Sequence, residues 1–244
     1  MITSIHINEH ASILSVIDQA KQALDDNNTG YCIIHNLLVT PEEFLDIINQ
    51  QIASSFTTSV GKNGKVFYDT VADRGSDMGL SKNTVLSTTS QAFPLHTDCS
   101  CLERPADVVT LYCVQSSSKG GESMVANIKL ILKKLTPDYI DFLLKTPFPF
   151  YSVRYPILEK NRGSYYVRFS HVELMASVSD EEYAAITNQL APFIRELNDP
   201  ANSITYKLNP NDCLIVNNRT CLHGRTAFED NSERLFYRMR QYRS

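Results

Sequence analysis

The sequence lacks the features that mark secreted and membrane-spanning proteins. Its first residues, Met1 to His6, contain no basic stretch followed by an apolar core, so we expect no signal peptide. No apolar run approaches the roughly 20 residues that are needed to span a bilayer. We therefore expect a soluble, cytoplasmic protein that has no membrane partner.

Positive charge is not in excess either. The chain has 23 Lys and Arg against 27 Asp and Glu, which gives a formal net charge of −4. Nucleic-acid-binding proteins usually carry a basic patch, so we expect no nucleic-acid partner. Basic residues cluster only between Arg234 and Arg243, where they alternate with Phe, Tyr and Met as in a strand with one polar face.

The six cysteines include no Cys-x-x-Cys pair. A disulfide framework is not expected in a cytosolic chain of this size. Cys99 and Cys101, even with histidines nearby, are weak evidence for a zinc site. We expect the cysteines to be small buried thiols in strands.

No internal repeat, low-complexity tract or linker divides the chain. Its 244 residues suit one domain, residues 1–244, with a helical N-terminal part over about 1–56 and a core over about 57–244. The sequence leaves open whether the protein forms a homo-oligomer. The polar stretch over 57–90 is predicted to be a loop, and a loop of this length in a compact domain is more often functional than idle.

Hydrophobic periodicity predicts a few helices and many short strands. Helices are expected over 10–26, 41–56, 136–145 and 180–197. Strands are expected near 31–38, 91–98, 106–115, 122–128, 149–155, 164–171, 203–208, 213–218 and 233–242. Many short strands separated by turns favour a sandwich or barrel, so the predicted fold class is mostly β with flanking α-helices.

Three segments carry the candidate chemistry. In the first, Phe93 to Asp98, a strand would point His96 and Asp98 to the same face, where both can reach one cation. A His-x-Asp pair alone is common and is usually a surface feature. In the second, Asp212 to Arg225, an apolar strand leads into a polar turn with His223 just beyond it. If the sheet folds back, His223 supplies a third ligand, and two His with one carboxylate suit iron(II).

The third segment, Glu233 to Arg240, places arginines at 234, 238 and 240, all on one face of an unbroken strand. Guanidinium binds carboxylates in a bidentate manner. The alternative is a row of solvent-facing side chains on an edge strand, which is the interpretation we favour for Arg240.

The order of these motifs resembles the taurine dioxygenase family: His-x-Asp, then Gly-Gly-x-Ser, then Asn-Arg-x-x-x-His-Gly-Arg, then Arg, from about Gln91 to Arg240. The resemblance implies a double-stranded β-helix (jelly-roll) core and an iron(II)- and 2-oxoglutarate-dependent oxygenase with dioxygen as co-substrate. The metal ligands would be His96, Asp98 and His223. The chain departs from the family at Asn217 and Asn211, where the family usually has Asp and Gly.

The resemblance also implies roles for residues around the metal. Arg234 follows His223 by eleven residues and would pair with the far carboxylate of 2-oxoglutarate, and Ser123 would support it. Arg238, four residues later, would lie near an anionic group of the prime substrate, such as an amino acid, free or carrier-bound. Asp98 argues against halogenation, because related halogenases have a small residue there, but it leaves desaturation and cyclisation open.

Other readings remain. Tyr68, Asp69 and Asp73 are candidate substrate contacts in the polar loop, with plain loop surface as the alternative. His171 is predicted not to be a ligand. A non-catalytic 2-oxoglutarate-binding relative and a zinc hydrolase are the rival classes, although a hydrolase has no use for Arg234.

Overall fold

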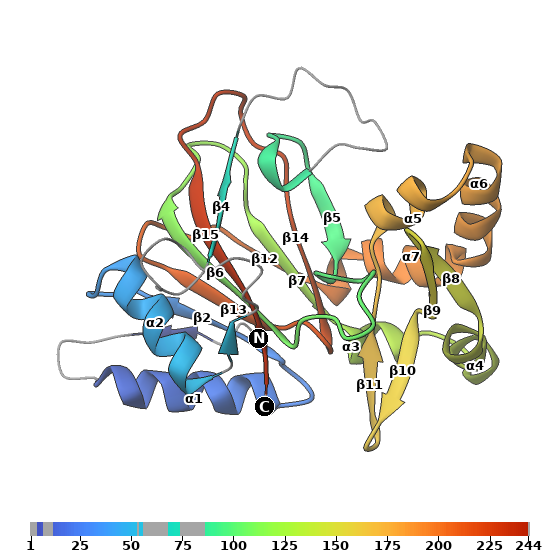
Figure 1. Ribbon diagram of the computed structural model, residues 1–244, viewed down its shortest axis with the longest axis horizontal. Coiled ribbons are helices and arrows are strands. Elements are labelled where there is room, and N and C mark those ends of the chain that lie inside the picture. The colour runs from blue at the N-terminus through green and yellow to red at the C-terminus, as the bar shows by residue number, and fades with distance from the viewer. Residues whose placement is uncertain (1–3, 7–11, 53, 56–67, 74–85, 244) are drawn as a thin grey trace.

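A computed structural model of the chain describes residues 4–6, 12–52, 54–55, 68–73 and 86–243 (Figure 1). The described residues form two main β-sheets with helices on both outer sides. The larger sheet has the order β1 (Ser4–His6), β2 (Tyr31–His35), β13 (Cys213–Asn217), β6 (Val108–Gln115), β15 (Leu235–Tyr242) and β3 (Ser54–Ser55), with β4 (Asp69–Ala72) also paired to β15. The smaller sheet has the order β12 (Ile204–Tyr206), β7 (Ser123–Asn127), β14 (Cys221–Arg225) and β5 (Phe93–His96).

The two sheets share an apolar core. Val125 and Cys221 from the smaller sheet pack with Ile33, Leu214 and Phe236 from the larger one. Every pairing in these sheets is antiparallel except that of β1 with β2. The strands therefore present one row of side chains to the space between the sheets and the other row to the helices outside.

Two helices cover the outer face of the larger sheet, at the left of Figure 1: α1 (Ile13–Asp25) and α2 (Pro41–Gln51). Their buried residues, among them Ile17 and Phe44, pack on Tyr112 and Met239. A capping box begins α2, where the Thr40 side chain and the Glu43 side chain each bond the other residue's backbone N–H. Near the C-terminus, an ion pair joins Arg243 to Asp25 of α1.

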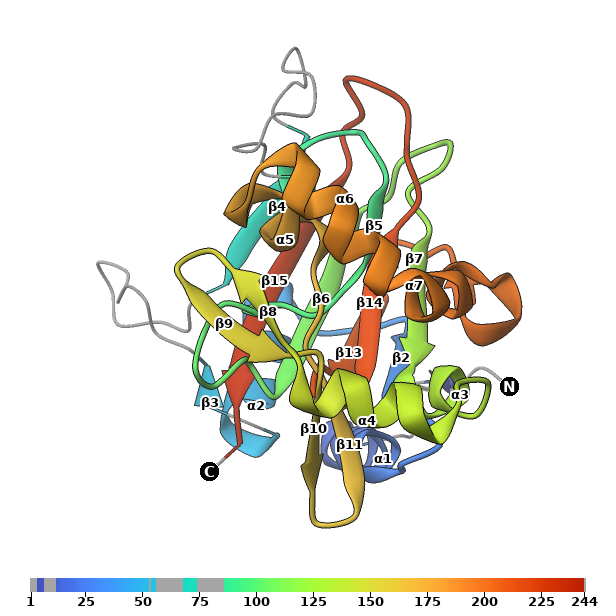
Figure 2. The same cartoon turned by 90° about the vertical axis from the view of Figure 1, so that its right-hand side faces the viewer.

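A second group of helices and hairpins covers the smaller sheet, at the right of Figure 1 and in front of the strands in Figure 2. Its helices are α3 (Ile128–Leu132), α4 (Pro137–Lys145), α5 (His171–Ser177), α6 (Asp180–Gln189) and α7 (Ala191–Asn198). Its hairpins are β8 (Pro147–Phe150) with β9 (Val153–Pro156), and β10 (Leu158–Asn161) with β11 (Ser164–Val167). Short 3-10 helices span Leu86–Thr88 and Pro200–Asn202. An apolar cluster that includes Phe150, Phe169 and Phe193 fixes this group on Leu222 and Ala126.

Three local expectations are wrong. The helix expected over 180–197 is two helices that meet at Leu190, because Pro192 has no N–H to continue the ladder. The strand expected to reach His171 ends at Val167, and His171 begins α5, where Ser170 caps the helix. The strand expected near 149–155 is instead the hairpin of β8 with β9, because the chain turns at Tyr151.

Of the helices among the described residues, none is both long enough and apolar enough to cross a membrane.

Candidate metal centre

Strand pairing brings the three predicted metal ligands together. β14 runs antiparallel to β5 with His223 directly opposite His96, and Asp98 follows two residues after β5 ends. One ligand atom of each residue lies within 4.8 Å of the others. All three residues are buried, with 4–5% of their surface exposed. The pairing register therefore unites residues that lie 125 or more positions apart.

The distances between the ligand atoms suit a metal ion. Nε2 of His96 lies 3.3 Å and Nε2 of His223 lies 3.7 Å from Oδ1 of Asp98. Two ligands bonded at about 2.1 Å and at right angles lie roughly 3 Å apart, so only small movements would complete the site. Nδ1 of His96 is 2.9 Å from the Pro94 carbonyl, which can only accept, so Nδ1 carries the proton and Nε2 presents its lone pair. Among the described residues, this Nε2 has no well-aligned hydrogen-bond partner.

The charge states of the site also suit a cation. Burial, together with the nearby His96, lowers the pKa of His223 to about 3, so its imidazole is neutral at neutral pH. Burial raises the pKa of Asp98, but the charge of Arg238, the adjacent His96 ring and the charge of Arg240 outweigh it and hold that pKa well below its usual range. The set thus offers a neutral imidazole and a carboxylate without losing protons first, and two imidazoles with one carboxylate suit a borderline divalent metal.

Backbone contacts hold the ligands in place. The side chain of Asn218 is fully buried, accepts from the Asp98 N–H (2.8 Å), and donates to the carbonyls of Asp98 (3.0 Å) and Ala106 (2.8 Å). Gly224 follows His223 where β14 and β5 come closest, and a Cβ there would lie 2.7 Å from the Phe93 carbonyl oxygen. Any other residue at 224 would push the two strands apart and separate the ligands.

A buried cation without a counter-ion lies beside the metal ligands. Arg234 and Ser123 line a small cavity of about 40 Å³ that His96 and His223 also border. Arg234 is 6% exposed, its Nε has no hydrogen-bond partner among the described residues, and it forms no ion pair with them. Burial, and next the charge of Arg225, lower its pKa to about 9. Since an unpaired buried charge is costly, this pocket is suited to an anion.

Arg225, the second arginine of the pocket, has a structural role. One of its terminal nitrogens donates to the carbonyls of Leu86 (3.1 Å), Thr89 (2.9 Å) and Gln91 (2.7 Å). Its guanidinium also lies over the ring of Phe228, 4.5 Å from the ring centre. Arg225 thereby holds the segment that precedes β5. Of these two arginines, Arg234 is the one with more donors left for a ligand.

The prediction that Arg240 faces solvent is wrong. β15 is flanked by β6 on one side and by β3 and β4 on the other, so it is not an edge strand. Arg240 donates from Nε to Oδ2 of Asp98 (2.8 Å) and from Nη1 to Oδ2 of Asp69 (2.6 Å). Arg238, on the same face, lies 3.5 Å from Asp98 and 3.4 Å from Asp69. Its Nε is buried and has no hydrogen-bond partner among the described residues.

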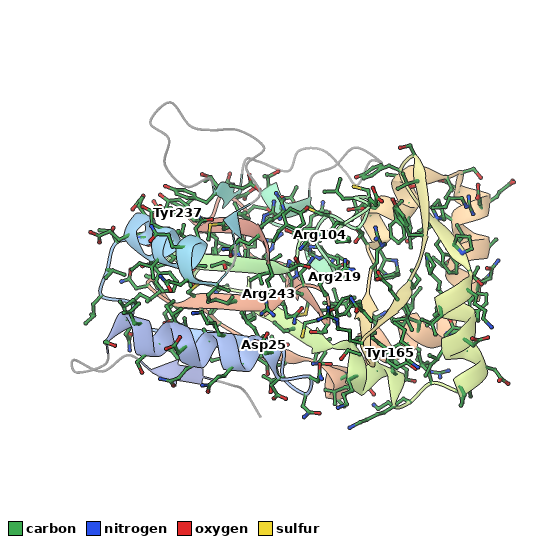
Figure 3. All side chains as sticks on the ribbon, turned by 60° about the horizontal axis from the view of Figure 1, so that its bottom comes forward. Asp25, Arg104, Tyr165, Arg219, Tyr237 and Arg243 are labelled. Atoms are coloured by element: carbon green, nitrogen blue, oxygen red, sulfur yellow. The ribbon has the colours of Figure 1, made fainter. Side chains whose placement is uncertain are left out.

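The other candidates from the polar loop lie apart from the metal ligands. Tyr68 donates to Glu42 of α2 (3.1 Å) and stacks on Tyr237, with ring centres 4.3 Å apart. Figure 3 shows Tyr237 beside α2, on the outer face of the larger sheet. Asp73 accepts a hydrogen bond from the Asn231 N–H (3.2 Å). Of the three loop candidates, only Asp69 reaches the site, and there it neutralises arginines.

His171 lies outside the ligand cluster, as expected. Its Nδ1 is 3.1 Å from the Tyr183 hydroxyl on α6. Sequence reasoning missed three residues near the metal: Arg240, Asn218 and Glu173. The equal parity of Arg240 with Arg234 and Arg238 was the signal that could have placed the first, and Asn218 stands inside the motif that ends at His223. No pattern distinguished Glu173, because a helix carries it to the site from a distant part of the chain.

The chain is similar to a known protein family, to curated proteins and to solved structures. The model of the family "Taurine catabolism dioxygenase TauD, TfdA family" matches residues 7–240. The chain is 26% identical over 172 residues to human gamma-butyrobetaine dioxygenase, which covers 63% of this chain and 44% of that protein. It is 26% identical over 218 residues to trimethyllysine dioxygenase of Meyerozyma guilliermondii, which covers 82% of this chain and 52% of that protein. The chain thus spans about half the length of these relatives.

The fold is also that of a solved structure of asparagine oxygenase in complex with Fe(II), 2S,3S-3-hydroxyasparagine and succinate. The TM-score is 0.69 at 15% identity, with 98% of this chain and 93% of that chain covered. The predicted fold class, mostly β with flanking helices around a jelly-roll core, is confirmed.

Proposed function

Because the chain belongs to the taurine catabolism dioxygenase TauD/TfdA family, we propose that it is an iron(II)- and 2-oxoglutarate-dependent oxygenase that hydroxylates a small substrate with an anionic group, such as an amino acid. The observation that carries the proposal is the meeting of two features in one buried region. Three side chains there offer ligand atoms to one cation, and next to them Arg234 is a buried cation that has no counter-ion among the described residues. A divalent metal and a dianionic co-substrate would satisfy both features.

His96, Asp98 and His223 would hold the iron. When bound, iron(II) supplies the centre at which dioxygen is reduced while 2-oxoglutarate is converted to succinate and carbon dioxide and a C–H bond of the substrate is hydroxylated. Three protein ligands on one face leave positions open for exogenous ligands. The buried setting of the ligands keeps bulk water from the centre, which protects the oxidising chemistry from side reactions.

Arg234 and Ser123 would bind the far carboxylate of 2-oxoglutarate. The guanidinium can donate paired hydrogen bonds, and the hydroxyl of Ser123, on strand β7 of the smaller sheet, adds another donor. A charge-assisted bond of this kind contributes about 1.5–3 kcal/mol to binding. The flanking rings of Phe228 and Phe236, whose centres lie 5.3 and 3.9 Å from the guanidinium carbon, keep the arginine in position.

Arg238 would meet the anionic group of the prime substrate. It lines both the small cavity with Arg234 and a larger one of about 410 Å³ in front of Asp98. Asp69 and Asp98 engage its terminal nitrogens only at 3.4–3.5 Å, and its Nε is unbonded among the described residues. It therefore retains donors for a ligand. Desaturation or cyclisation would use the same arrangement of residues. These residues therefore define where the substrate is oxidised, and they do not distinguish hydroxylation from the other two outcomes.

The rival classes use less of the site. A zinc hydrolase needs a general base beside the metal and gives no reason for an unpaired buried Arg234. A non-catalytic 2-oxoglutarate-binding protein would use Arg234 but would not need the open side of the ligand set to face a 410 Å³ cavity. The oxygenase accounts for every one of these features.

Anaerobic titration of the metal-free protein with Fe(II) and then 2-oxoglutarate tests the proposal. We expect a weak visible charge-transfer band in the wild type, and loss or strong weakening of that band in Arg234→Ala. The matched control is Arg104→Ala, since the Arg104 side chain is 62% exposed and pairs with Asp107 at the surface. A wild type that binds iron and never develops the band would rule out the oxygenase. Succinate formation in air, in the presence of a substrate, would then confirm turnover.

A further inference from the structure

The cavity in front of Asp98 is lined by groups of both charge signs. β15 contributes Arg238 and Arg240 to the lining, and α5 contributes Glu173. At about 410 Å³ the cavity is large enough for a small polar molecule. It opens directly onto His96 and Asp98, so a molecule bound there would lie next to the metal.

Local structure fixes where Glu173 points. The Glu173 N–H donates to Oγ of Ser170 (3.3 Å), which caps α5 and sets the direction of its first turn. Leu174, the next residue, is fully buried in the apolar cluster under the helix, so α5 cannot rotate freely. The carboxyl group of Glu173 is therefore held at the cavity wall by the packing of its neighbours.

One carboxylate oxygen of Glu173 has no hydrogen-bond partner in the described part of the chain. Its Oε2 is buried and forms no hydrogen bond with any described residue. Neither carboxylate oxygen lies within 4.0 Å of a described Lys, Arg or His nitrogen, and the Arg168 guanidinium nearby donates instead to the carbonyls of Ser100, Leu102 and Glu103. Burial, and next the charge of Asp98, raise the pKa of Glu173 to about 7. The backbone N–H and the thiol of Cys101 lower that pKa again by hydrogen bonding to the carboxyl group. Oε2 still lacks a donor or a cation among the described residues.

The other acidic side chains of the site are already paired with basic side chains. Asp69 takes hydrogen bonds from Arg238 and Arg240, and Asp98 faces both arginines as well as the histidines. Glu173 is thus the acidic side chain of the described cavity wall that remains open to a ligand, just as Arg238 is the basic one.

We propose that Glu173 binds a protonated nitrogen of the prime substrate, an ammonium or guanidinium group that carries N–H, while Arg238 receives the anionic group. The substrate is then a zwitterion that lies across the cavity between α5 and β15. This inference rests on the proposed function and gives its substrate a chemical class. Glu173 acts as a specificity-determining residue and takes no part in holding metal or 2-oxoglutarate.

The nitrogen must carry N–H because Oε2 lacks a hydrogen bond. A quaternary ammonium group has no donor and is bound instead by aromatic faces. The described cavity wall offers two aromatic rings, Phe93 and Tyr151, and Phe93 is stacked on His96 with ring centres 3.8 Å apart. Tyr151 is 52% exposed. The described wall therefore favours a hydrogen-bonding cation over a methylated one.

Calorimetric titration of the full-length protein, loaded anaerobically with Fe(II) and 2-oxoglutarate, tests the inference. The ligands form two series of fixed carbon chain: hexanoate, L-norleucine, 6-aminohexanoate and L-lysine, and the four-carbon butyrate, 2-aminobutyrate, 4-aminobutyrate and 2,4-diaminobutyrate. We expect at least one amine-bearing acid to bind about tenfold or more tightly than the amine-free acid of its series. Glu173→Gln should remove that advantage and leave the affinity for the amine-free acid within about twofold.

The control variant is Glu182→Gln on the neighbouring helix α6, whose side chain is 49% exposed, and it should keep the discrimination. If no amine-bearing acid in either series binds better than its amine-free counterpart, or if the advantage survives in Glu173→Gln, the inference is wrong. If 4-aminobutyrate binds more tightly than butyrate, 4-(trimethylammonio)butyrate, which has no N–H, should not. If both compounds bind equally well and both lose affinity in Glu173→Gln, the requirement for N–H is wrong.

The affinity for 2-oxoglutarate separates this inference from the proposed function. Glu173→Gln should leave that affinity unchanged, whereas Arg234→Ala should lower it. If the wild type binds no 2-oxoglutarate, the proposed function fails. The affinities for amine-bearing and amine-free acids are then compared with Fe(II) alone. A preference for the amine-bearing acid that is lost in Glu173→Gln supports the role of Glu173, and the absence of such a preference contradicts it.

Discussion

Nε of Arg240 donates a 2.8 Å hydrogen bond to Oδ2 of Asp98, while the ring nitrogens of His96 and His223 face the other oxygen, Oδ1. The two carboxylate oxygens therefore have separate tasks. One is held by a charged donor on β15, and the other is free to bind a metal beside the two imidazoles. A carboxylate fixed in this way does not rotate, so its ligating oxygen remains aimed at the centre of the site.

Arg240→Gln should lower the affinity for Fe(II) about tenfold, because partners that orient a ligating carboxylate typically contribute a factor of 10 to 100 to metal affinity. Competition with a metal-binding dye under anaerobic conditions measures the change. Arg104→Gln, which removes an exposed pair with Asp107, is the control and should leave the affinity unchanged. Equal affinity in wild type and Arg240→Gln would mean that Asn218 and Arg238 suffice to orient Asp98.

His223 and His171 should contribute differently to Fe(II) binding. His223→Ala should reduce Fe(II) binding by at least a hundredfold, because it removes one of three protein ligands. His171→Ala should change it less than twofold, because His171 contacts Tyr183 on α6 rather than Asp98. The same dye competition measures both variants, and an equally large loss in His171→Ala would show that the ligand set is wrong.

Asn218→Ala should destabilise the protein by about 2–4 kcal/mol, because it leaves the N–H of Asp98 and the carbonyls of Asp98 and Ala106 without the partner they have in the fold. Urea unfolding followed by circular dichroism measures the loss. Asn188→Ala on the exposed side of α6 is the control and should stay within about 0.5 kcal/mol of the wild type. A small effect of Asn218→Ala would imply that the turn after β5 is held by its own backbone.

Glu173 should make stability depend on pH between its usual pKa of 4.5 and about 7, the value to which burial raises it. In this window the folded state binds more protons than the unfolded state, so the contribution of Glu173 to stability falls as the pH rises. Glu173→Gln lacks this penalty. Its stability relative to the wild type should therefore improve by on the order of 2 kcal/mol from pH 5 to pH 8.

Urea midpoints across that pH range, without metal or substrate, measure this difference. The charged and titratable groups that act on Glu173 are Asp98, Arg168, Cys101 and Tyr151, and they are the same in both proteins. A pH-independent difference between the two proteins would show that the carboxyl group is solvated and titrates normally.

Much of the fold and part of the site follow from short-range patterns. The helix starts near Pro41, Thr136 and Asp180 and most core strands were predicted from periodicity and turn residues, because these depend on a few neighbouring residues. The errors occurred where context decides. Pro192 divides a helix that hydrophobic spacing alone would continue, and Ser170 turns the end of a strand-like run into a helix cap.

The sequence by itself determined the residue types and their local spacing. His96 and Asp98 stand two apart, and Arg234 stands eleven after His223, which was enough to indicate the family. Strand geometry gives such spacing its meaning, because side chains two residues apart share a face. These relations depend only on short stretches of backbone.

Only the tertiary structure decided which distant residues meet. The register of β14 against β5 places His223 opposite His96, the burial of β15 between neighbouring strands turns Arg240 toward Asp98, and the packing of α5 brings Glu173 to the cavity. Each of these arrangements brings together residues 65 or more positions apart. Its formation depends on how whole sheets and helices bury their apolar faces, and no short window of sequence contains that information.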